Sequence, residues 1–177
     1  MRVGVCVSAV LMIVVIIGGF SPGCISASHS TKDIITYWHS ISAFTAKETI
    51  KIGNQTFESY VAFTKPDEIT REDYSNDSLV QKIIIKNGVQ KVVTGNGTFI
   101  LNATLDDVNA LDPFVAILNN LDSFNVKRQG DILLLKPKTE GMPTYKVELN
   151  GKLPERITIK QAGLTIVVEY KTIEVAK

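Results

Sequence analysis

Few side chains in this sequence could carry out catalysis or hold a metal. The chain has two histidines, His29 and His39, and two cysteines, Cys6 and Cys24. His29 lies in a short polar stretch and His39 beside Trp38 in an amphipathic segment, which favours solvated side chains over general bases. No Gly-x-Ser-x-Gly, His-Glu-x-x-His or Cys-x-x-Cys motif occurs. A serine hydrolase, zincin or structural zinc site would therefore lack its minimum groups, and we predict neither enzyme, cofactor nor metal.

The acidic residues give no catalytic pair either. Asp106 and Asp107 are neighbours in the sequence, as are Glu72 and Asp73, and adjacent side chains usually point apart. We expect both pairs to lie in solvent. The stretch Gly95-Asn96-Gly97 lacks the Lys-Ser/Thr of a phosphate loop and lies between β-rich segments, so it predicts a turn.

The chain begins as exported proteins do. Arg2 is followed by an apolar block of 18 residues from Val3 to Phe20, and then by small residues. This order is typical of a signal peptide, although the block is also long enough for an uncleaved anchor. In both cases we predict a location at the outer face of the cytoplasmic membrane or in the cell envelope.

Cys24 lies where the apolar block gives way to polar residues. Gly23 fits the lipobox of bacterial lipoproteins, whereas the two residues before it do not. Cys6 lies inside the apolar block, so a chain that starts at Cys24 has no second cysteine for a disulfide. We predict lipid attachment at Cys24, which would anchor the protein in the membrane. Cleavage near 26–28 and an uncleaved helix are the alternatives.

The predicted organisation is a signal peptide or membrane anchor at 1–23, a tether at 24–30 and a single domain at 31–177. Arg2 is the only charged residue before Lys32, so the exported part carries equal numbers of basic and acidic residues. This balance gives no attraction to nucleic acid. Four Asn-x-Ser/Thr triplets predict glycosylation, at Asn54, Asn76, Asn96 and Asn102.

The rest of the sequence predicts one short helix followed by an antiparallel sheet. Ser30 can cap a helix whose apolar face includes Ile34 and Trp38. From Thr45 the chain consists of β-rich stretches broken by turn residues. Asn-Gly pairs at 87–88 and 150–151 predict two hairpins.

Alternation within the strands gives the sheet one apolar and one polar face. Lys146, Glu148, Thr165 and Glu169 have the polar parity and should face solvent. The meander is interrupted by a helical stretch that restarts at Pro113, with Asp112 as its cap. The apolar positions of this stretch should pack against the apolar side of the sheet; they are Leu105, Val108, Leu111, Phe114, Val115, Leu118 and Leu121.

The order of these elements resembles the LolA family of periplasmic lipoprotein carriers and related lipoproteins. The resemblance covers roughly residues 30–177 and includes Lys65-Pro66, Arg71 and Tyr74, the hairpin at 87–88, the proline-broken helix and "LPERITI" near the end. The strand "VQKVVTG" lacks the Trp or Tyr that the family usually has there.

The resemblance implies an α+β fold, an incomplete antiparallel β-barrel with helices packed in the concave face. It also implies that Arg71 holds a lid closed and that lipid, lipoprotein acyl chains or another apolar ligand binds in the concavity. The alternative is an envelope protein-interaction or sensor module with a fully packed core. The predicted cavity residues are Trp38, Ile41, Phe44, Phe57, Val61, Phe63, Leu118, Leu121, Val147, Ile166 and Val168.

Overall fold

The computed structural model describes residues 29–161 and 163–177, so the predicted signal peptide and Cys24 lie outside the described residues. None of the described helices is both long and apolar enough to cross a membrane. The strands are β1 (Ala43–Ile52), β2 (Gln55–Thr64), β3 (Glu68–Ser75), β4 (Ser78–Lys86), β5 (Val89–Thr94), β6 (Gly97–Asn102), β7 (Phe124–Gln129), β8 (Ile132–Pro137), β9 (Thr144–Asn150), β10 (Leu153–Gln161) and β11 (Leu164–Ala176).

The first helix, α1 (Thr31–Ser40), begins where the sequence predicts it. The Asp33 amide donates to the Ser30 hydroxyl and the Ser30 amide donates to the Asp33 carboxylate, both at 3.1 Å. This reciprocal pair satisfies two amides that the first helical turn leaves free. Ile34 and Trp38 are buried on the inner side of the helix.

A second helical stretch divides into α2 (Leu105–Leu111) and α3 (Pro113–Asn119), followed by one 3-10 turn (Leu121–Ser123). Asp112 ends α2 and caps α3, because its carboxylate accepts a 2.8 Å hydrogen bond from the Val115 amide. The predicted break at Pro113 and the cap at Asp112 are therefore confirmed.

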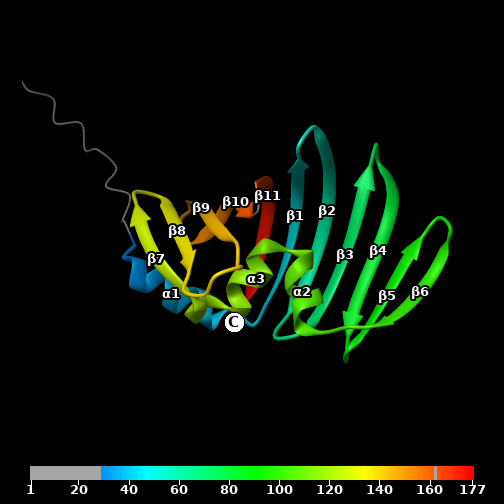
Figure 1. Ribbon diagram of the computed structural model, residues 1–177, viewed down its shortest axis with the longest axis horizontal. Helices are drawn as coiled ribbons and strands as arrows, with labels where there is room; N and C mark the ends of the chain where they lie inside the picture. Colours follow the sequence, from blue (N-terminus) through cyan, green and yellow to red (C-terminus); the bar gives the residue numbers. More distant parts are fainter. Residues whose placement is uncertain (1–28, 162) are drawn as a thin grey trace, which may run out of the picture.

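All 11 described strands form one antiparallel sheet in the order β6-β5-β4-β3-β2-β1-β11-β10-β9-β8-β7. Both predicted Asn-Gly hairpins are confirmed, as β4–β5 and β9–β10. The pairing of β1 with β11 joins the first and last described strands, and no local signal in the sequence indicated it. The free edges are β6 and β7, which lie at opposite ends of the curved sheet (Figure 1).

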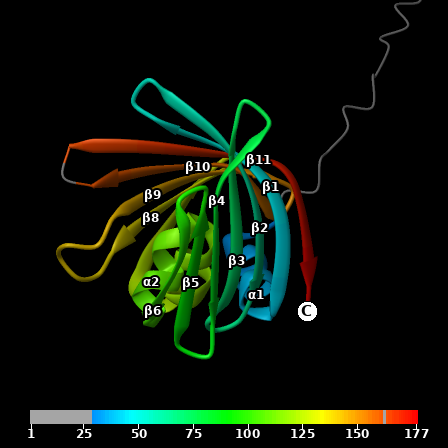
Figure 2. The ribbon, with the colours of Figure 1, turned by 90° about the vertical axis from the view of Figure 1, so that its right-hand side faces the viewer.

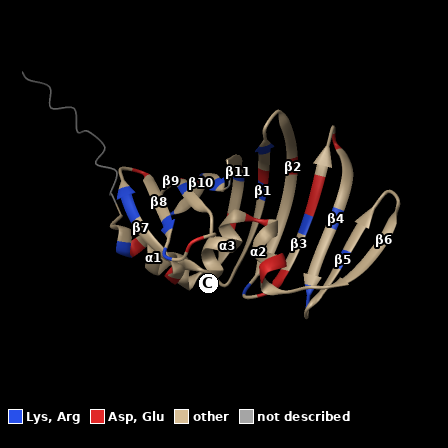
Figure 3. Cartoon of the chain, viewed as in Figure 1, with Lys and Arg blue, Asp and Glu red and all other residues tan. Residues whose placement is uncertain are grey.

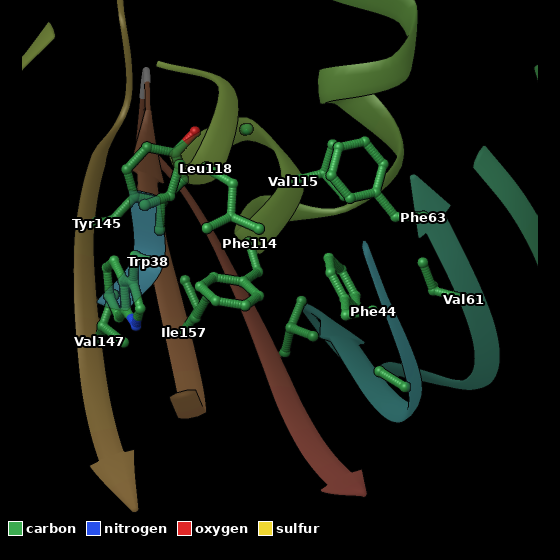
Figure 4. Packing of buried hydrophobic residues seen from close by; sticks show 14 of the residues in the cluster. Trp38, Phe44, Val61, Phe63, Phe114, Val115, Leu118, Tyr145, Val147 and Ile157 are labelled. Carbon is green, nitrogen blue, oxygen red and sulfur yellow. The ribbon is translucent and has the colours of Figure 1, made fainter. Parts of the chain in front are cut away.

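The sheet curves around the helices without closing, so the predicted fold class, an α+β incomplete β-barrel with helices in the concave face, is confirmed (Figures 1 and 2). Buried apolar residues of the concave face and the helices form one cluster, part of which is shown in Figure 4. We call the opposite side of the sheet the outer face.

Two expectations about single residues are wrong. Asp73 is buried, because β3 turns it towards the concave face and its carboxylate accepts hydrogen bonds there. Leu105 is 43% exposed, because it starts α2 at the rim of the sheet and only Val108 of that helix is fully buried. Asp106 and Asp107 are exposed as expected, and Asp107 also caps α2 through Thr104.

Candidate functional site in the concave face

The predicted cavity residues lie together on the concave side, and most of them are packed rather than open to solvent. Phe57 and Ile166 are half-buried. The other nine are buried in the central cluster: Trp38, Ile41, Phe44, Val61, Phe63, Leu118, Leu121, Val147 and Val168.

Aromatic rings from α1, α3 and the sheet fill this part of the concavity (Figure 4). The Phe114 ring lies 5.3 Å from that of Trp38 and 5.4 Å from that of Phe44, measured between centroids. Phe44 also contacts Phe63, at 5.6 Å. The Trp38 indole nitrogen donates a 2.7 Å hydrogen bond to the Lys152 carbonyl, so even the polar atom of this ring is satisfied. We call this region, between α1, α3 and β7–β11 with β1 and β2, the packed half.

The rest of the concave face, between α2 and β3–β6, is less completely filled. We call it the open half. Phe99 and Leu101 point to the concave side of β6 and are 53% and 55% exposed. A hollow of about 190 Å³ lies under α2, lined by Pro66, Asp67, Ile85, Gly88, Ala103, Thr104, Leu105 and Val108.

Arg71 holds α2 against the sheet. Its side chain rises from β3, where Nε donates to the Asp73 carboxylate at 2.7 Å and Nη1 donates to the carbonyl of Leu111, the last residue of α2. A second attachment runs through Asn119 of α3, whose amide donates to the Asn109 side-chain carbonyl of α2 at 2.8 Å and to the Pro66 carbonyl at 3.0 Å. These contacts restrain a helix that otherwise presents only one fully buried apolar side chain to the core.

A row of polar side chains crosses the concave face beneath the junction of α2 and α3. Successive strand registers align Tyr170 of β11, Glu48 of β1, Ser59 of β2, Asp73 of β3 and Gln81 of β4. We call these five residues the polar row. Three of its side chains form one connected unit, since Ser59 donates to one Asp73 oxygen and Gln81 donates to the other, the latter at 2.6 Å.

The polar row also reaches the helices above it. The Tyr170 hydroxyl donates a 3.0 Å hydrogen bond to the Asp112 carboxylate, which also caps α3. Arg71 links Asp73 to the end of α2. The polar row therefore attaches the α2–α3 junction to the sheet by hydrogen bonds, within an otherwise apolar surface.

Glu48 is the one member of the row without a hydrogen bond among the described residues. Its side chain is fully buried and neither carboxyl oxygen has a partner. Burial, followed by the negative charge of Asp112, raises the pKa of Glu48 well above its usual value, although Arg71 opposes the shift. The site thus favours the neutral acid at this position.

The same environment acts on two tyrosines. Burial raises the pKa of Tyr170 well above its usual value, and the negative charge of Asp112 adds to the effect. Burial, with a smaller effect of Asp112, raises the pKa of Tyr145 to about 12. Both hydroxyls therefore remain protonated donors. Across 29–161 and 163–177, no group of three or more His, Cys, Asp or Glu side chains could hold a metal ion.

Two larger hollows, of about 500 and 420 Å³, lie on the outer face. Both are lined by Thr45, Ala62 and Thr70, outward-facing side chains of β1, β2 and β3 that leave shallow space because they are short. A ligand that avoids water needs walls on more than one side, and only the hollow in the concave face has a helix above the sheet. We therefore place the candidate site under α2, in the open half.

The polar row could not be recognised from local sequence patterns, although one signal for it exists. Glu48 has the same parity in β1 as Phe44, Ala46 and Ile50, so an acidic residue stands at a position that should be apolar. Alternation in β3 is less regular, because a bulge follows Asp73, and its burial does not show in the sequence.

No family model matches the chain, and no curated protein sequence matches it. Solved structures with a similar layout include the MucA/MucB complex of Pseudomonas aeruginosa, with 10% identity and a TM-score of 0.49 over 82% of this chain and 56% of that chain. LprF from Mycobacterium bovis has 8% identity and a TM-score of 0.41, over 80% of this chain and 90% of its own. A DUF1329 family protein from Desulfovibrio piger has 12% identity and a TM-score of 0.37, over 80% and 88%. The chain thus spans little more than half of the first of these.

Proposed function

We propose that this chain is an exported, membrane-tethered protein of the LolA-like family that binds an apolar ligand, such as a lipid or an acyl chain, between α2 and β3–β6. The observation that carries the proposal is the short helix α2, which covers an apolar surface and is held by few contacts, so that it could serve as a lid. One of these is the Arg71 hydrogen bond to the Leu111 carbonyl. Phe99 and Leu101 are exposed on the concave side of β6 and would extend this apolar surface.

The size of the hollow requires the lid to move. Ligand pockets usually measure about 300–1,000 Å³, more than the 190 Å³ found under α2. Displacement of α2 would join the hollow to the apolar surface of β5 and β6. The described state is then the closed one, and the Arg71 contacts stabilise it, which is the lid role predicted for Arg71.

Uptake of a fluorescent fatty acid, together with mass spectrometry of an organic extract, tests this function. Ala103 lines the hollow under α2, whereas Ala62 lines the outer hollows, so the two alanines form a matched pair. We expect Ala103→Trp to abolish uptake and Ala62→Trp to leave it intact. The reverse pattern would place the ligand on the outer face, and no uptake or co-purified lipid in the parent protein would exclude a carrier.

A protein-interaction module is the second candidate, because nine of the eleven predicted cavity residues are already packed against other side chains. In that case the rim of a filled half-barrel would recognise a partner in the envelope. The same extraction separates the two functions, since an interaction module carries no lipid.

We further propose that Cys24 carries the lipid anchor and that the exported domain is glycosylated. All four predicted acceptor asparagines are exposed, which supports access by a transferase: Asn54, Asn76, Asn96 and Asn102. The intact mass of the membrane-extracted protein tests both proposals. A chain that starts at Met1 or after residue 28 would exclude the lipid on Cys24, and unmodified asparagines would exclude the glycans.

A further inference from the structure

The outer face of β4–β6 combines lysines with apolar side chains and has no acidic residue. From Ser78 to Thr104 the sequence contains three lysines and neither Asp nor Glu, and Figure 3 shows β5 and β6 without an acidic segment. Ile83 and Ile85 of β4 are buried on the concave side, so their neighbours point outward. The outward-facing lysines and large apolar residues are Val80, Lys82, Ile84, Lys86, Val89, Lys91, Val93 and Ile100.

Exposed apolar side chains concentrate in this part of the molecule. Three of the ten large hydrophobic residues that are exposed in the described chain lie on this outer face, Val80, Val89 and Ile100, and Phe99 and Leu101 are exposed on the concave side of the same sheet edge. Ile100 has the highest exposure, 70%, and stands on the free edge strand β6. Edge strands usually carry a charge or a proline that prevents association, and β6 has neither. Such a surface marks an interaction site.

The charges on the outer face of β1 and β9–β11 are arranged differently. There Arg156 contacts both Glu148 and Glu169, at 3.2 and 3.1 Å, and Lys51 also reaches Glu169. In these ion pairs the basic and acidic side chains neutralise each other's charge. On β5, by contrast, Lys91 is exposed and forms no ion pair within the described residues.

The two lysines of β4 have partners outside the face itself. Lys82 contacts Glu72 at 2.6 Å and Lys86 contacts Glu68 at 3.1 Å, both on the neighbouring strand β3. Acidic side chains therefore begin at the border with β3. The surface from β4 to the β6 edge remains cationic and apolar, which is complementary to anionic headgroups above an acyl layer.

We propose that the outer face of β4–β6 docks onto the surface of an anionic lipid bilayer. Ile100 and Val89 would enter the interfacial layer, while the Lys91 stem lies along it and its ammonium group contacts lipid phosphates. The docking surface stands independently of the ligand site. Together they would place the entrance beside Phe99 and Leu101, on the concave side of the same strands, next to the membrane that supplies the ligand.

Protection of Lys91 from an amine-reactive reagent tests the docking in the full chain. Asn102 lies opposite Val89 on the same outer face, so a glycan at Asn102 and docking by this face exclude each other. The protein is therefore produced without glycans and is reconstituted into vesicles of phosphatidylcholine alone or mixed with phosphatidylglycerol. We expect loss of Lys91 labelling only in the anionic vesicles, and its return at high salt. Lys127 on β7, at the opposite edge, serves as the internal control and should label equally in both.

Two variants separate docking by this face from a general attraction of the chain to anionic vesicles. Ile100→Asp should restore labelling of Lys91, whereas Leu164→Asp, at a 51% exposed residue of β11, should not. In Lys91→Ala the labelled amine is absent, so docking is measured by hydrogen exchange at the Val89 amide. Binding to anionic vesicles should be about five-fold weaker than in the parent protein, since one basic side chain contributes about that factor at an anionic surface. Fatty-acid uptake by Ile100→Asp should be normal. A loss of membrane docking can therefore be distinguished from a loss of ligand binding.

Two results would overturn the proposal. One is equal labelling of Lys91 in both kinds of vesicle. The other is protection that appears in lipid-free solution and grows with protein concentration, because a second copy of the chain would then be the occupant of the β6 edge.

Discussion

The packed half and the open half of the concave face share one sheet and differ in what covers them. In the packed half, α1 and α3 supply Trp38 and Phe114, which are fully buried. In the open half Val108 is the only fully buried side chain of α2, and Phe99, Leu101 and Leu105 remain exposed. We therefore expect the packed half to contribute most of the free energy of folding, and α2 to move away from the open half at a lower cost. Five substitutions test this division.

The largest effect is expected in the packed half. Trp38→Ala removes a fully buried ring and its hydrogen bond to Lys152, which should lower the free energy of unfolding by about 3–5 kcal/mol. Leu105→Ala in the open half should change it by less than about 0.5 kcal/mol. Denaturant titration measures both values. Similar losses for the two variants would contradict the division into halves.

The attachment of α2 by Arg71 should come next. Arg71→Met removes charged hydrogen bonds to Asp73 and to the Leu111 carbonyl, so we expect a loss of about 2 kcal/mol. Amides of α2 should also exchange hydrogen faster, while those of α1 remain protected. Exchange that accelerates equally in both helices would show a general loss of stability and no lid.

Glu48 should make stability depend on pH. Below the ordinary glutamate pKa of 4.5 the side chain is neutral in both the folded and unfolded states. Above that pH only the unfolded chain releases the proton, because the pKa of Glu48 is raised in the fold. Stability then falls by about 1.4 kcal/mol per pH unit until the raised pKa is reached.

The test is a comparison of Glu48→Gln with the parent protein over a range of pH. The variant should be more stable than the parent at pH 8 and equal to it at pH 4, as measured by thermal unfolding. Parallel curves would show that Glu48 does not titrate in this way. Asp112, Asp73 and Arg71 face the same site and are unchanged in both proteins.

The smallest effect is expected on the outer face. Arg156→Ala breaks ion pairs with Glu148 and Glu169, in which the arginine side chain is 44% exposed. Solvent-exposed pairs contribute less than about 1 kcal/mol, and salt should reduce this further. Denaturant titration at low and high salt gives the value. If Arg156→Ala lowered the free energy of unfolding as much as Arg71→Met does, the expected difference between these two arginines would be contradicted.

Local features of the fold could be predicted from the sequence, and the arrangement of the site could not. The helix caps at Ser30 and Asp112 and the Asn-Gly turns involve only a few neighbouring residues, so they can be predicted from the local sequence. The polar row depends on registers between five strands, and the exposure of Leu105 depends on where α2 ends up. Both are properties of the assembled sheet. Asp73 illustrates the limit, since its burial follows from contacts with Ser59 and Gln81 in other strands.

The pairing of β1 with β11 has a consequence for how this protein folds. Ala43 lies opposite Ala176, so β1 cannot complete its pairing until β11 has been made. Contacts between residues so far apart in the chain raise the contact order and slow folding. Until β11 has been synthesised, β1 has a free edge beside β2, which favours aggregation. Truncation of the final strand should therefore impair folding of the whole domain.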